Sequence, residues 1–185
     1  MDKQLLEMTL EELWKLFPIS LTEHKKYWNS WYEEEEKYLL SLILASVKIY
    51  HIGSTAVPKI WAKPIIDILV EADINVFQTI KEQLVNNGYI CMADSEHQID
   101  FNKGYTLKGF AERVFHLHLK EYGNNDELYF RDFLNEHADV AKQYERMKLL
   151  LWKKHEYNRD AYTKSKTEFI QKYTQIAKED YGKRY

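Results

Sequence analysis

The pattern of apolar positions divides this chain into helical ends and a strand-rich middle. Thr9-Leu-Glu-Glu12 is a capping box that predicts a short helix ending before Pro18. Ser20-Leu-Thr-Glu23 is a second capping box, and it predicts the start of a long helix. In that helix aromatic and aliphatic residues recur every three to four positions between Trp28 and Ile43.

The middle of the chain carries short apolar runs separated by polar, glycine-containing turns, which predict strands near residues 47–52, 65–71, 89–92, 99–101 and 113–119. A helix capped by Asp73 and ended by Gly88 interrupts them. From Asp126 onward the periodicity is helical, with one continuous stripe running from Tyr162 through Lys166 to Ile176. This order predicts an α/β (α+β) fold, in which a small mixed sheet is covered on one side by N-terminal and C-terminal helices.

Length and composition limit the function classes. At 185 residues we expect a single domain, residues 1–185. The net charge of -3 shows no basic excess, so we expect no nucleic-acid partner. No apolar run approaches the ~20 residues of a membrane helix, so we expect no membrane partner either. The single cysteine, Cys91, and the absence of a cationic-then-apolar start predict a cytoplasmic protein. The sequence leaves the oligomeric state open.

The strongest chemical signal is the stretch from His51 to Val70. It reads as a strand, a Gly-Ser-Thr turn at Gly53, Ser54 and Thr55, an irregular arm, and a second strand whose only acid before Glu71 is Asp67. Glycine lets a ligand approach the backbone, and hydroxyls beside exposed amides suit phosphate. A carboxylate in an apolar run is costly to bury without a partner, so we favour a functional role for Asp67 over a structural one.

A second signal is His116-Leu-His118 on a predicted strand. Period-two alternation places both imidazoles on one face of that strand. Asp67 with one or both histidines predicts a metal site, and imidazole ligands favour Zn, Mn, Fe or Ni over Mg. The alternative is a pair of histidines on an exposed strand face.

Three basic residues are candidates for binding phosphate. Lys63 precedes the strand of Asp67, Lys166 interrupts an aromatic stripe, and Arg131 lies in Phe130-Arg-Asp-Phe-Leu134. The alternatives are a lysine that extends outward to solvent for Lys166 and a core ion pair for Arg131. Glu71 reads as a solvated strand end, too far along the strand to join Asp67.

The motif His51-Ile-Gly-Ser-Thr55 followed by Lys63-Pro-Ile-Ile-Asp67 resembles the signature of the GrpB family. The resemblance continues through Phe115-His-Leu-His118 and Tyr162-x-x-x-Lys166. It implies a nucleotidyltransferase-like, polymerase-beta-like fold, whose pattern is Gly-Ser, about a dozen residues, then acid-apolar-acid. Gly53, Ser54 and Asp67 match that pattern, but Leu69 stands where the second acid belongs.

The resemblance leaves two functions to distinguish. In the first, a nucleotidyltransferase holds a nucleotide or phosphorylated small molecule and a divalent metal ion, and transfers a nucleotidyl group to a hydroxyl acceptor. Asp67 is then the catalytic residue. In the second, the protein is a non-catalytic nucleotide- or metabolite-binding accessory module, or a metal-dependent hydrolase with an Asp/His site. The missing second acid favours the second function.

Overall fold

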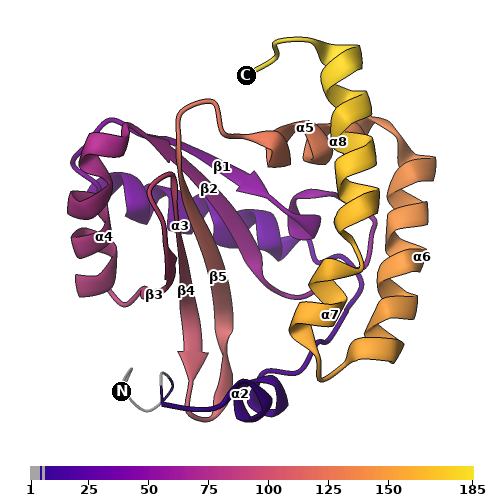
Figure 1. The fold of residues 1–185 in the computed structure, drawn as a ribbon, viewed down its shortest axis with the longest axis horizontal. Helices are drawn as coiled ribbons and strands as arrows, with labels where there is room; N and C mark the ends of the chain where they lie inside the picture. Colours follow the sequence, from indigo (N-terminus) through magenta and orange to yellow (C-terminus); the bar gives the residue numbers. More distant parts are fainter. Residues whose placement is uncertain (1–4, 6) are drawn as a thin grey trace.

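A computed structural model describes residue 5 and residues 7–185 (Figure 1). Five strands form one mixed sheet in the order β1-β2-β5-β4-β3. Only the β2–β5 pair is parallel, and the other three pairs are antiparallel. The strands are β1 (Lys48–Ile52), β2 (Ile66–Ala72), β3 (Ile90–Asp94), β4 (Gln98–Thr106) and β5 (Gly109–Glu121). Each predicted strand is therefore confirmed, although β4 and β5 run further than their apolar cores.

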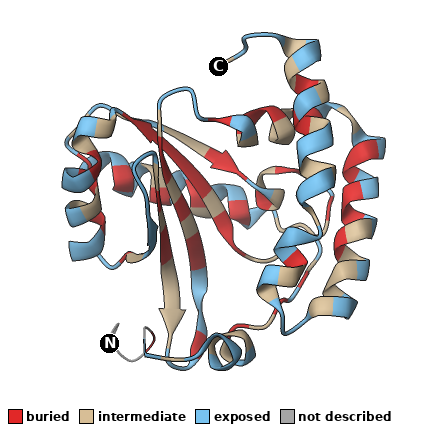
Figure 2. Cartoon of the chain, in the orientation of Figure 1, coloured by how far each residue is buried: buried red, intermediate tan, exposed pale blue. Residues whose placement is uncertain are grey.

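Helices lie against both faces of the sheet, so the prediction that only one side is covered was wrong. On one face, α3 (Tyr27–Leu42) and α4 (Phe77–Asn86) pack on a core that includes Ile66, Ile68 and Leu117. On the other face, α5 (Asp126–Glu136) places Leu128 against Leu69 of β2. The reason is visible in β2, where residues pointing to both faces are buried (Figure 2).

The C-terminal helices α5, α6 (Ala138–His155) and α8 (Thr167–Tyr181) gather at one side of the sheet (Figure 1). Together they enclose a second apolar cluster that also includes Val57 and Ile60 of the arm before β2. The short helix α7 (Arg159–Lys164) connects α6 to α8. The arm between β1 and β2 is thus held between the sheet and the C-terminal helices.

Two boundaries differ from the prediction. The capping box at Thr9 is present and opens α2 (Leu10–Leu16), but the one at Ser20 is wrong, because α3 begins only at Tyr27. Thr22 instead forms a two-way backbone bridge with Ala62, which holds this segment extended. The stripe from Tyr162 to Ile176 is not one helix either, since α7 ends at Lys164 and α8 starts at Thr167. Lys166 therefore lies at a junction between two helices.

Candidate functional site

The Gly-Ser-Thr turn follows β1 directly and forms a short 3-10 helix, η1 (Ser54–Ala56). Gly53 adopts φ +71° and ψ -171°, a conformation that side chains disfavour. A β-carbon at Gly53 would collide with Oδ2 of Asp67 on the neighbouring strand. Glycine is therefore required here on two grounds, and the turn backbone lies directly against the carboxylate of Asp67.

Hydrogen bonds inside the turn use the hydroxyl of Thr55. This hydroxyl donates to the carbonyl of Ile65 at 3.2 Å, so it accepts from Nε2 of His51 at 3.0 Å. The ring of His51 also stacks on Tyr32, with 4.6 Å between centroids. Burial lowers the pKa of His51 to about 4, which keeps the ring neutral. The structure thus uses the Thr55 side chain to hold the turn, whereas the sequence predicts that it contacts phosphate.

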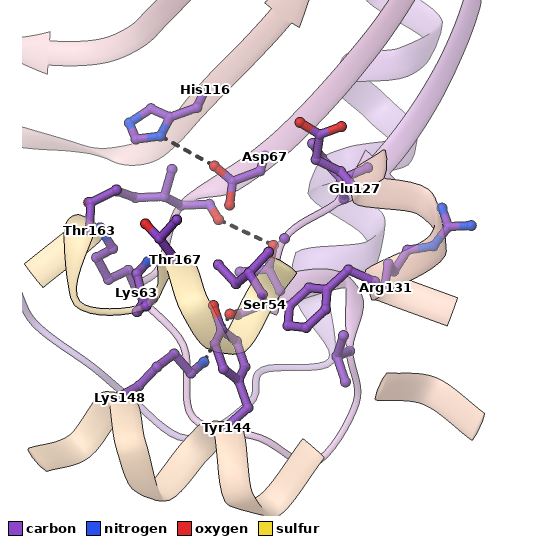
Figure 3. A pocket seen from close by; sticks show the side chains of 18 of the residues that line it. Ser54, Lys63, Asp67, His116, Glu127, Arg131, Tyr144, Lys148, Thr163 and Thr167 are labelled. Atoms are coloured by element: carbon purple, nitrogen blue, oxygen red, sulfur yellow. Dashed lines mark hydrogen bonds and ion pairs between the residues drawn. The ribbon is translucent and has the colours of Figure 1, made fainter. Parts of the chain in front are cut away.

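Asp67 and His116 are direct neighbours across the parallel β2–β5 pair. Nδ1 of His116 lies 3.3 Å from Oδ1 of Asp67, as the alternation pattern predicts for side chains on one face (Figure 3). The Asp67 side chain is 28% exposed. Burial opposes its ionisation, but the hydrogen bond from His116 and nearby positive charge, including Lys63, outweigh burial and lower its pKa. Asp67 is therefore a carboxylate at neutral pH.

A chain of hydrogen bonds extends from Asp67 to helix α7. Arg159 donates from Nη2 to the hydroxyl of Tyr105 at 2.6 Å, and that hydroxyl lies 2.8 Å from Nε2 of His116. A guanidinium can only donate, so the Tyr105 hydroxyl accepts from Arg159 and donates to His116. His116 consequently carries its proton on Nδ1, toward Asp67. Burial lowers the pKa of His116 and keeps the imidazole neutral.

The two histidines of the His-x-His motif have different partners. Nδ1 of His118 lies 2.7 Å from Oδ1 of Asp100 on β4. Burial lowers the pKa of His118, but Asp100 and Asp67 outweigh it and raise that pKa. Both ring nitrogens of His116 are engaged, by Tyr105 and Asp67. Within residue 5 and residues 7–185, no three His, Cys, Asp or Glu side chains are arranged to hold a metal ion.

The second acid expected of a metal site is absent for a visible reason. Leu69, two residues after Asp67, is fully buried and packs with Ile52 and Leu128. Glu71, further along β2, is 1% exposed rather than solvated, so that prediction was wrong. It accepts hydrogen bonds from the backbone of Gly123 and the side chain of Asn125, 2.8 and 3.0 Å away. Apolar packing and a structural acid occupy the positions beyond Asp67.

Lys148 is a residue of this site that the sequence did not single out. From α6 its ammonium donates to Oγ of Ser54 at 2.9 Å and to the carbonyl of Trp61 at 2.5 Å (Figure 3). The residue is only 2% exposed. Burial, and then the charge of Lys166, lower the pKa of Lys148 to about 7. A signal was present, because Lys148 stands four residues after Tyr144 on the buried stripe of its helix.

Lys63 and Lys166 meet at the ring of Tyr162. Their ammonium groups lie 5.1 and 4.6 Å from its centroid. Burial, and then the charges of Lys166 and Arg159, lower the pKa of Lys63 well below its ordinary value. Burial lowers the pKa of Lys166 to about 8, with Asp67 opposing the shift. Both lysines line the same cavity as Asp67, as the sequence predicts for phosphate-binding residues.

Arg131 also lines this cavity, but its guanidinium is engaged by other groups of the protein. Its guanidinium pairs with Asp132 at 2.7 Å and donates to the carbonyl of His51 at 2.9 Å and the hydroxyl of Tyr185 at 3.1 Å. Figure 3 shows it extending away from Asp67. The structure therefore gives Arg131 the core ion pair, the alternative to the predicted phosphate contact.

These groups surround one cavity of about 820 Å³. Its polar side includes the Ser54 turn, Asp67 and the basic residues Lys63, Lys148, Lys166 and Arg159. Its apolar side comes from the C-terminal helices, with Phe130, Leu134, Tyr144 and Ile170. The volume is within the usual range of small-molecule sites. The lining also carries Arg131, Lys164 and the acids Asp126, Glu127 and Asp160, so that six Lys and Arg residues accompany four Asp and Glu residues.

The family model described as GrpB protein matches residues 18–176. The chain belongs to the GrpB family. UPF0157 protein YqkA of Bacillus subtilis is 35% identical over 177 residues, covering 91% of this chain and 51% of that protein. This chain thus spans about half the length of that relative. Glutamate-rich protein GrpB of Alkalihalophilus pseudofirmus is 35% identical over 162 residues, covering 82% of this chain and 91% of that protein.

The solved structure of a GrpB protein agrees with this assignment. The crystal structure of conserved protein GrpB from Enterococcus faecalis superimposes with a TM-score of 0.76 at 29% identity, covering 88% of this chain and 99% of that one. Structures of the Cid1 poly(U) polymerase align more distantly, one with a TM-score of 0.49 at 13% identity, over 84% of this chain and 51% of that one. Across the described residues, no helix of this GrpB family member has both the length and the apolar character needed to cross a membrane.

Proposed function

We propose that this GrpB family member binds a nucleotide or another phosphorylated small molecule in the cavity beside Asp67. The supporting observation is the cluster of Lys63, Lys148, Lys166 and Arg159 near Asp67, in a lining where Lys and Arg outnumber Asp and Glu by six to four. Burial lowers the pKa of Lys63 and of Lys148, and the charge of Lys166 lowers both further. Such mutual repulsion costs stability, and an anion bound among these cations relieves it.

We place one phosphate of the ligand at the Ser54 turn. The ammonium of Lys148 already lies on its hydroxyl, and both hydrogen-bond acceptors of that ammonium are neutral groups. A phosphate oxygen placed there exchanges a neutral acceptor for an anionic one, so that both partners of the hydrogen bond are charged and the bond is stronger. The rest of the ligand then lies toward Phe130 and Tyr144, where the wall is apolar and aromatic.

A magnesium-centred site fits these residues poorly. Mg²⁺ takes oxygen ligands in near-octahedral geometry, and Asp67 faces the cavity without an acid at position 69. We therefore assign the neutralisation of phosphate charge to the lysines and to Arg159. The Zn or Mn site expected at Asp67, His116 and His118 stays a prediction, which calorimetry with these metals tests.

The two functions set out from the sequence differ in the step after ligand binding. Nucleotidyl transfer needs a nucleophile close to the bound phosphate, whereas an accessory module needs only affinity. The packing of Leu69 against Leu128 favours binding without magnesium-dependent transfer. Retention of Asp67 as an ionised group beside the turn supports transfer.

Calorimetric titration of ATP, ADP and AMP, each with EDTA and with Mg²⁺, tests the proposal. We expect binding that persists in EDTA. We also expect Lys166→Gln to lower affinity by roughly tenfold or more, since hydrogen bonds to charged groups contribute about 1.5–3 kcal/mol. Lys172→Gln, at an exposed position of α8, the helix that follows Lys166, is the matched control and should bind as wild type does. If none of these ligands binds, or if both variants match the wild type, the proposal is wrong.

A further inference from the structure

Three side chains from three strands stand in series beside the cavity. The hydroxyl of Tyr105 on β4 lies 2.8 Å from Nε2 of His116 on β5, and Nδ1 of His116 lies 3.3 Å from Asp67 on β2. A hydroxyl, a base within hydrogen-bond reach and a third group that orients the base form the structural signature of an activated nucleophile. A somewhat long contact between base and orienting acid is common in ligand-free sites.

A fourth residue, Arg159, determines the direction in which the Tyr105 hydroxyl donates its proton. Because it donates to the Tyr105 hydroxyl at 2.6 Å, the phenolic proton must point at His116. The guanidinium also lies over the Tyr105 ring, 5.5 Å from its centroid. Burial raises the pKa of Tyr105, and Arg159 opposes that rise. The phenol oxygen therefore has a base to take its proton and a cation to stabilise the charge that develops.

A purely structural role explains less of this arrangement. The Tyr105 ring packs against Phe17 and Phe110, with centroids 4.6 and 5.1 Å away, and phenylalanine would serve that packing equally well. The hydroxyl, however, contacts two groups that line the main cavity, His116 and Arg159. It is thus at the border of the cavity in which we place the phosphates.

We propose that Tyr105 is a nucleophile that accepts a nucleotidyl group from a nucleoside triphosphate bound in this cavity. This inference rests on the proposed function. The phenol oxygen attacks the α-phosphorus, and an O–P bond forms while the bond from that phosphorus to the bridging oxygen breaks. Pyrophosphate leaves with the bonding electron pair. The phenolic proton moves to Nε2 of His116, and Asp67 stabilises the resulting imidazolium.

The basic residues around Tyr105 can neutralise the negative charge that this step produces on the pyrophosphate and on the phenol oxygen. Lys63 and Lys166 are placed to neutralise the departing pyrophosphate, and Arg159 stays with the phenol oxygen. No atom changes oxidation state, and the product is a phosphodiester between Tyr105 and the nucleotide. The substrate class is a nucleoside triphosphate, and the acceptor is the protein itself.

Mass spectrometry of the purified chain tests the inference. The protein is incubated separately with ATP, GTP, CTP and UTP, each with Mg²⁺, with Mn²⁺ and with EDTA. We expect one nucleotidyl addition at Tyr105 with at least one triphosphate, and none in Tyr105→Phe. His116→Gln should slow the addition by about a hundredfold or more, the usual contribution of a general base. Tyr122→Phe, at an exposed tyrosine, is the matched control and should be modified as wild type is.

Binding of a non-hydrolysable triphosphate analogue separates the two proposals. If the analogue binds wild type and Tyr105→Phe equally but no adduct forms at Tyr105, this inference is overturned while the proposed function stands. An adduct at another residue that persists in Tyr105→Phe overturns it as well. If the analogue does not bind the wild-type protein, this inference fails, and the proposed function fails with it only when ATP, ADP and AMP do not bind either. Equal analogue binding by the variant also shows that it is folded.

Discussion

Replacing Lys148 by methionine should flatten the dependence of stability on pH. The ammonium of Lys148 is buried, and its pKa falls from 10.5 to about 7 in the folded protein. Between these values the unfolded chain keeps a proton that the folded chain has released. Stability rises with pH wherever the unfolded state binds more protons, so this lysine makes the folded protein more stable at pH 9 than at pH 7.

The size of this stability change follows from the pKa of Lys148 in the unfolded chain and its pKa in the folded protein. Integrating the difference in bound protons from pH 7 to pH 9 gives a gain of ~2 kcal/mol from Lys148 alone. Lys166, whose pKa is lowered to about 8, adds a smaller increment of the same sign that the substitution leaves largely in place. The stability comparison should stop at pH 9, because tyrosines in the unfolded chain ionise near pH 10 and would add their own pH dependence to the unfolding free energy.

Urea unfolding followed by tryptophan fluorescence at pH 7, 8 and 9 measures this effect. We expect the unfolding free energy of Lys148→Met to rise by ~2 kcal/mol less than that of wild type over this range. Lys153→Met, at an exposed position of the same helix, should keep the wild-type slope. Parallel pH curves for wild type and Lys148→Met would refute the idea that a buried, readily deprotonated lysine lies against Ser54.

Three further substitutions test other parts of the site. Gly53→Ala should destabilise the protein by at least ~1–3 kcal/mol in urea unfolding, because it combines backbone strain with a collision at Asp67. Asp67→Asn should lower Zn or Mn affinity in calorimetry while leaving the fold intact, and equal binding by both proteins would remove Asp67 from any metal site. Arg131→Gln should cost about 1–3 kcal/mol of stability through its lost bonds to His51 and Tyr185, yet leave nucleotide affinity unchanged. Reduced affinity in that variant, with its fold intact, would return Arg131 to the ligand site.

Local patterns in the sequence predicted the parts of this site that depend on strand alternation. Asp67, His116 and His118 share a face because period-two spacing holds along β2 and β5, and the glycine of the turn is required by a close approach that a Gly-Ser-Thr motif already indicates. The parallel pairing that brings these strands together depends on contacts between residues far apart in the chain, which periodicity does not encode.

The contributions of the C-terminal helices were harder to predict. A lysine on a buried stripe reads as a side chain extending to solvent, so Lys148 was not distinguished from its neighbours. Arg159 and Tyr105 each look ordinary in the sequence, and only the tertiary structure brings them within 2.6 Å of each other. The Ser20 capping box failed because a backbone bridge between Thr22 and Ala62 outweighs a local helix signal.

The parallel register of β2 against β5 determines both which side chains of β2 enter the hydrophobic core and which one faces the cavity. Along β2, Ile66 and Ile68 enter the core beneath α3, while Asp67 between them faces the cavity. A slip of one residue would bury the carboxylate in that core and turn the isoleucines toward the ligand. We therefore expect the site and the core to form together on folding. Any ligand that binds it should protect the amides of β2 and β5 from hydrogen exchange together, as a single cooperative unit.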